Sequence, residues 1–65
     1  MTDPWQALVK RAAKIEARRG LYEATLYAYN TAVTDPALSE YVNELGFDLH
    51  NLEHGGEGYS FLPRG

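Results

Sequence analysis

The chain has 65 residues, of which 45% are hydrophobic and 23% are charged, and it contains no cysteine. A chain of this length forms one small domain with a marginal core, which excludes most enzymes. The absence of cysteine excludes a disulfide framework, thiol chemistry and iron–sulfur ligation. A metal ion and self-association are the two remaining means of reinforcing so small a core.

The charges are divided unequally along the chain, whose net charge is −3. Residues 1–20 carry five basic and two acidic side chains, whereas residues 21–65 carry one basic and seven acidic side chains. A negative total argues against a general binder of polyanions. We expect the basic and acidic parts to attract each other, within one chain or between chains.

Residues 1–5 do not have the basic and then apolar pattern of a secretory signal. The longest apolar run, residues 26–29, is far shorter than the ~20 residues that a membrane helix needs. We therefore expect a cytoplasmic protein with no membrane contact.

The first predicted element is a helix that begins at Thr2-Asp3-Pro4, where an oxygen-bearing side chain precedes a proline. Apolar residues then recur at steps of three and four, with the polar Arg19 at one position of the pattern. This spacing is typical of a helix with an apolar seam. These residues are Trp5, Leu8, Ala12, Ile15, Tyr22, Leu26, Tyr29 and Val33.

Gly20 leaves two interpretations of this stretch open. Basic residues followed by glycine are typical of a helix end, so a helix over residues 4–19 could be followed by a second one from Leu21. The heptad phase, however, continues across Gly20, and it favours one long or gently kinked helix over residues 4–33. A strand over residues 21–33 is a weaker alternative, because no partner strand follows.

A second helix is predicted over residues 36–53, because Thr34-Asp35-Pro36 repeats the first start signal. Its seam has spacings of 4, 3, 4 and 3, at Leu38, Val42, Leu45, Leu49 and Leu52. The short connection predicts an antiparallel pair, so the fold class is all-α, with a helical hairpin domain over residues 1–54. If Gly46 does not break this helix, Phe47 lies in solvent.

Residues 55–65 are predicted to be a glycine-rich linker and a short non-helical apolar tail. Tyr59, Phe61 and Leu62 could pack back over the hairpin or reach a neighbouring protein.

A thirty-residue first arm is longer than the second arm and leaves its N-terminal end uncovered, while residues 21–33 are apolar nearly all round. Two hairpins forming a dimeric four-helix bundle would bury both surfaces. A compact three-helix monomer, with breaks at Gly20 and near Pro36, is the alternative. The residues predicted for the interface are Trp5, Val9, Leu21, Tyr27, Phe47, Tyr59, Phe61 and Leu62.

Two candidate sites are weaker. His50, Glu53 and His54 match the H-x-x-E-H pattern of some zinc enzymes, but the match is short and lacks a third ligand outside it. Zinc or another divalent metal is therefore an alternative, and no other cofactor is expected. A basic stripe on the first helix could contact the phosphates of a nucleic acid, although no known motif accompanies it. Its residues are Lys10, Arg11, Lys14 and Arg18.

No arrangement of nucleophile, base and acid can be recognised, since the only serines are Ser39 and Ser60. We therefore predict a non-catalytic, self-associating helical protein that acts as a regulator, adaptor or assembly subunit by binding another macromolecule. The expected partner is a protein. Metal binding and nucleic-acid binding are the alternatives.

Overall fold

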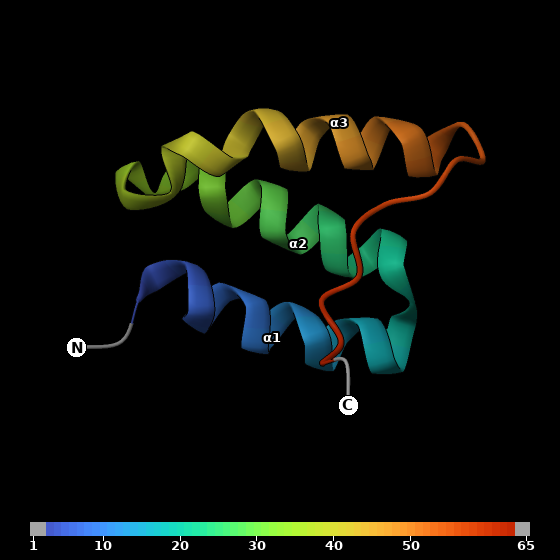
Figure 1. Ribbon diagram of the computed structural model, residues 1–65, viewed down its shortest axis with the longest axis horizontal. Helices are drawn as coiled ribbons and strands as arrows, with labels where there is room; N and C mark the ends of the chain where they lie inside the picture. The colour runs from blue at the N-terminus through green and yellow to red at the C-terminus, as the bar shows by residue number, and fades with distance from the viewer. Residues whose placement is uncertain (1–2, 64–65) are drawn as a thin grey trace.

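The computed structural model describes residues 3–63, which form helices and no strand, so the all-α prediction is confirmed (Figure 1). The order along the chain is α1, α2, a short 3₁₀-helix η1, and α3. Their bounds are Pro4–Arg19, Leu21–Thr34, Pro36–Tyr41 and Val42–Glu53.

Both predicted helix starts are confirmed. Asp3 Oδ1 accepts a hydrogen bond from the Trp5 N–H at 3.0 Å, and Asp35 Oδ1 accepts one from the Ala37 N–H at 3.0 Å. In each case a proline occupies the first helical turn. N–H groups of this turn have no partner within the helix, so proline loses no hydrogen bond there. Local chemistry alone therefore determines where α1 and η1 begin.

The prediction of one helix over residues 4–33 was wrong, because the chain breaks at Gly20. This residue has φ 95° and ψ 170°, a backbone conformation that is essentially restricted to glycine. Its N–H donates to the Glu16 carbonyl oxygen at 3.0 Å and completes the last turn of α1. The chain then reverses, so that α2 runs antiparallel to α1 (Figure 1).

The second arm also differs from the prediction, since residues 36–41 form a 3₁₀-helix and the α-helix begins only at Val42. Gly46 does not break α3, and the expected exposure of Phe47 is confirmed at 66%. A Cβ on Gly46 would lie only 3.0 Å from Tyr29 Cε1. Glycine here allows α3 to approach the Tyr29 ring of α2 closely.

The helix α2 lies between α1 and α3 and contacts both (Figure 1). Its inner positions carry small side chains, so that neighbours on both sides come close. The apolar surface of residues 21–33 is thus partly covered by the chain's own helices, while Tyr22 and Val33 are 40% and 55% exposed. The buried core consists of Leu8, Ala12, Ala24, Ala28, Ala32, Leu38, Leu45 and Phe61.

This arrangement is a compact unit of three α-helices and one 3₁₀-helix, and the dimer stays a prediction. The tail runs from the end of α3 back across the molecule to α1 (Figure 1). Glu16 holds it there: its carboxylate accepts from Ser60 Oγ at 2.6 Å and from the Phe61 N–H at 2.7 Å. The Phe61 ring is buried, with 4% of its surface exposed.

Candidate functional site

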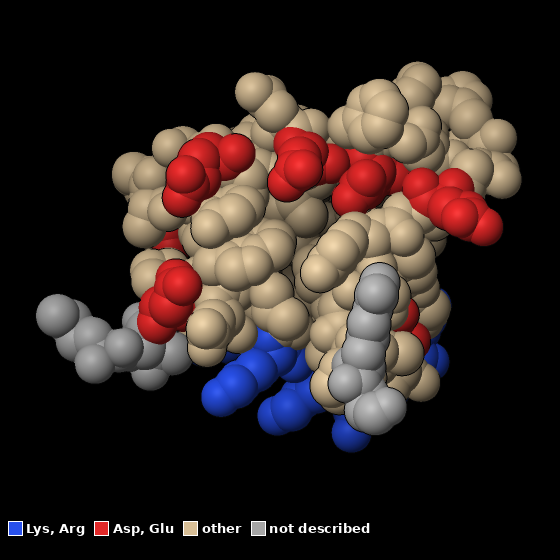
Figure 2. Space-filling model, in the orientation of Figure 1, with Lys and Arg blue, Asp and Glu red and all other residues tan. Residues whose placement is uncertain are grey.

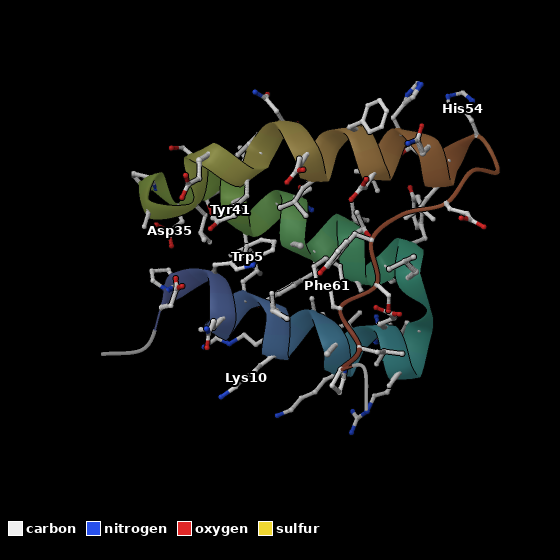
Figure 3. The ribbon with its side chains drawn as sticks, viewed as in Figure 1. Trp5, Lys10, Asp35, Tyr41, His54 and Phe61 are labelled. Atoms are coloured by element: carbon white, nitrogen blue, oxygen red, sulfur yellow. The ribbon has the colours of Figure 1, made fainter. Side chains whose placement is uncertain are left out.

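An aromatic groove opens where α1, η1, α3 and the tail meet. Trp5 stacks on Tyr41 with ring centroids 4.1 Å apart and planes 12° from parallel. Figure 3 shows these two rings close together, with Phe61 beside them. The groove has a volume of about 370 Å³ and is lined by Trp5, Tyr41, Glu44, Leu45, Asp48, Tyr59 and Phe61.

Each lining segment is positioned by an identifiable hydrogen bond, local for the two helix starts and long-range for the tail. The Asp3 cap begins α1 and places Trp5 in its first turn. The Asp35 cap begins η1, whose last residue is Tyr41. Glu16 fixes the tail, and with it Tyr59 and Phe61. The groove is therefore built largely by elements that are held in place before any ligand binds.

The groove has a negative edge. Glu44 and Asp48 lie one turn apart on α3, and none of the described lining residues is Lys or Arg. Partial desolvation raises the pKa of Tyr41 above 10.0, and the negative charges of Glu40, Asp3 and Glu44 raise it further. Figure 2 shows a band of Asp and Glu side chains over α3, with Lys and Arg at the opposite edge of the molecule.

The residues predicted for the interface fall into three groups. Phe47, Tyr59 and Leu62 are exposed, by 66%, 63% and 42%. A second group is half-buried against the chain's own core, and Phe61 belongs to that core, with 4% of its surface exposed where it lines the groove. The half-buried group consists of Trp5, Val9, Leu21 and Tyr27.

The sequence analysis did not identify Tyr41, Glu44 and Asp48 as site residues. Their spacing, at three and four residues, is a signal that could have grouped them on one helix face. It also gave Glu16 no special role. That role depends on a contact 44 residues away along the chain, which no local pattern reports.

The predicted metal ligands are only partly brought together. The rings of His50 and His54 have centroids 4.4 Å apart, at the exposed end of α3 that His54 marks in Figure 3. Glu53 instead accepts a hydrogen bond from the Tyr22 hydroxyl at 3.3 Å. Within residues 3–63, no group of three or more His, Cys, Asp or Glu side chains is arranged to hold a metal ion. The two imidazoles could supply two ligands to an ion.

The predicted basic stripe is divided between two surfaces. Lys14 and Arg18, together with Arg19, line a second hollow of about 450 Å³ between α1 and α2. Lys10 instead borders a third hollow beside the tail, and Arg11 is exposed on α1. Nucleic-acid binding by these residues stays a prediction.

Comparisons with protein-family models, with curated proteins and with solved structures find no match to this chain. In the part of the chain that the structure describes, no helix combines the length and the apolar character that crossing a membrane requires. The functional argument therefore depends on the geometry of the surface.

Proposed function

We propose that this chain is a small non-catalytic binding protein that recognises another protein through the aromatic groove. A role as a regulator, adaptor or assembly subunit requires such a recognition surface. The observation that carries the proposal is a concave cluster of aromatic rings with acidic residues at its edge, built by three segments that are distant in the sequence.

The chemistry of the groove suits protein recognition. Tyrosine and tryptophan are enriched at interfaces because their rings bury a large area while their polar atoms still reach water or a partner. Tyr59 is 63% exposed although it lines a hollow, so a ligand would cover a ring that one chain leaves in water. The groove is also largely preformed, which lowers the entropy cost of binding.

Peptide selection tests this proposal without knowledge of the natural partner. The full chain is used to select binders from a displayed library of random peptides, and the binding surface is mapped by amide chemical shifts. We expect the binders to occupy the groove and to lose affinity on Tyr59→Ser. The matched control is Phe47→Ser, which removes an exposed aromatic ring outside the groove.

Two outcomes contradict the proposal. One is that no peptide binds the groove, or that Phe47→Ser weakens binding as much as Tyr59→Ser. The other is that oligonucleotides bind the basic edge of α1 more tightly than any peptide binds the groove, with an affinity that falls steeply as salt rises.

Metal binding is a second candidate function, favoured by the adjacent rings of His50 and His54. A metal that binds only the folded state must raise the melting temperature, by an amount that grows with the logarithm of its free concentration above the Kd. We expect zinc to raise the melting temperature of the natural chain and to have no effect on His50→Gln. Equal shifts in both proteins would contradict a site at these two residues.

A further inference from the structure

We infer that the aromatic groove receives an arginine side chain from the partner protein. This inference rests on the proposed function, because it names the chemical group that the same groove recognises. It is carried by two features that line the same groove, namely aromatic rings and a pair of carboxylates.

The rings provide the first contact. A cation is attracted to the face of an aromatic ring, most strongly to tryptophan. Trp5 and Tyr41 lie nearly parallel and both line the groove, so a planar cation that enters it meets aromatic rings. The arginine guanidinium is planar and weakly hydrated, and it stacks on aromatic faces more readily than the strongly hydrated lysine ammonium.

The carboxylates provide the second contact. Glu44 and Asp48 are separated by four residues on α3, which places them on the same face of the helix and beside the rings. Guanidinium presents N–H groups in a fork that matches the two oxygens of a carboxylate. A guanidinium stacked on the rings could donate to a neighbouring carboxylate at the same time.

The distribution of charge over the molecule also favours a cationic ligand in the groove. Glu44 and Asp48 of α3 line the groove, and Figure 2 shows acidic side chains in a band over α3, with the basic side chains at the opposite edge of the molecule. An anionic ligand would therefore be repelled from this groove. A cationic side chain would instead be attracted by the carboxylates of Glu44 and Asp48.

Trp5 gives a direct signal for the experiment, because it is the only tryptophan of the chain. The natural chain is titrated with three blocked peptides, Gly-Arg-Gly, Gly-citrulline-Gly and Gly-Lys-Gly, in about 0.15 M salt to screen non-specific attraction. Citrulline preserves the planar shape of arginine without its charge. We expect the arginine peptide to change Trp5 fluorescence and to bind about tenfold more tightly than the citrulline peptide.

The variants separate the groove from general charge. The double variant Glu44→Gln with Asp48→Asn removes the acidic edge, and we expect about a tenfold loss of affinity for the arginine peptide. The control, Glu23→Gln with Glu57→Gln, removes the same charge outside the groove. The inference is overturned if the citrulline or lysine peptide binds as well as the arginine peptide, or if the control weakens binding equally.

Failure of this inference can be distinguished from failure of the proposed function. If selected peptides without arginine bind the groove and lose affinity on Tyr59→Ser, the function stands and the choice of arginine is wrong. Sedimentation in the same buffer tests whether a second copy of this chain occupies the groove. Self-association that is abolished by the Glu44→Gln and Asp48→Asn variant would overturn the assignment to a partner protein.

Discussion

Glu16 determines where the C-terminal tail lies. Its carboxylate accepts hydrogen bonds from Ser60 Oγ and from the Phe61 N–H, which places the Phe61 ring in the core. A hydrogen bond to a charged group contributes more than a neutral one, and a donor left without its partner costs more still. One half-buried side chain on α1 thus controls one wall of the groove.

We expect Glu16→Ala to lower the free energy of unfolding by about 1–3 kcal/mol, because both hydrogen bonds are lost. Glu16→Gln should lose less, since its amide oxygen can still accept one of them. Urea denaturation measures the stability, and hydrogen exchange at the Phe61 amide reports release of the tail. Unchanged protection of that amide in Glu16→Ala would contradict the role of Glu16.

Thr25 contributes unfavourably to the core. Its side chain is 1% exposed, and its Oγ1 has no hydrogen-bond partner among the described residues. We expect Thr25→Val, which replaces the hydroxyl by a methyl group of similar size, to raise the free energy of unfolding by about 1 kcal/mol.

Thr31→Val is the matched control in the same helix, because the Thr31 hydroxyl donates to the Tyr27 carbonyl oxygen at 2.9 Å. This variant should show no such gain. A loss of stability in Thr25→Val, measured by urea denaturation, would show that the Thr25 hydroxyl has a favourable partner in solution.

Tyr22 gives a prediction that depends on pH. Its pKa is raised above 10.0, first by desolvation, then by the charge of Glu53, by the hydrogen bond to Glu53, and by Glu23. The folded chain therefore holds the phenol proton more tightly than the unfolded chain. The resulting stabilisation is complete below pH 10 and is lost as the pH rises through the pKa of the folded state.

We expect Glu53→Gln to lower the pKa of Tyr22 toward 10.0, because the negative charge beside the phenol is removed. Ultraviolet titration of the phenolate, with Tyr22→Phe to assign the transition, measures this change. A transition of Tyr22 that does not move in Glu53→Gln would contradict the contribution of Glu53.

At the level of the elements, Gly20 separates one predicted helix into two. Without this residue the heptad pattern of residues 4–33 would favour a continuous helix, and no reversal would bring α1 against α2. Small side chains then decide how closely the helices pack, since Ala24, Ala28 and Gly46 allow α2 to lie between two neighbours. The turn and the small residues together bring α1 and α3 against α2 within one chain.

We expect Gly20→Ala to lower the free energy of unfolding by about 1–3 kcal/mol, because φ 95° and ψ 170° are unfavourable for an L-residue. No atom lies within 4 Å of the added Cβ, so the loss would come from the backbone and not from a clash. A chemically synthesised chain with D-alanine at this position is the control, since its mirror-image preference suits positive φ. Equal losses in both chains would contradict this explanation.

At the level of the whole molecule, three helices form a flat unit with extents of 36 × 26 × 17 Å, and opposite charges lie at opposite edges (Figure 2). The core is closed by one chain. Any self-association must therefore use the surface, through exposed rings such as Phe47 and through contact between the basic edge of one copy and acidic residues outside the groove of another, such as Glu53.

We expect reversible self-association of this kind. The mass in sedimentation should rise above 7.3 kDa with protein concentration at low salt. It should return toward that value in about 0.5 M salt, where charge contacts are screened. A mass of 7.3 kDa at every concentration would contradict the predicted dimer. A dimer unaffected by salt would instead indicate an apolar interface.

Much of the fold could be predicted from local patterns. Asp3-Pro4 and Asp35-Pro36 begin helical segments because their side chains and prolines act within one turn. The apolar spacing identified the buried residues Leu8, Leu38 and Leu45. The candidate site was harder to predict from the sequence. Tyr59 and Phe61 were predicted as apolar tail residues, but Tyr41, Glu44 and Asp48, which line the groove with them, were not predicted as site residues.

The amino-acid sequence by itself determined the helical class, the helix starts and the unequal distribution of charge, because these depend on neighbours within a few residues. Only the tertiary structure decided that the chain turns back at Gly20, that Glu16 holds the tail, and that Trp5 stacks on Tyr41. The physical reason is that these features depend on contacts between distant segments. Glycine is compatible with both a turn and a helix, and only the packing that follows selects between them.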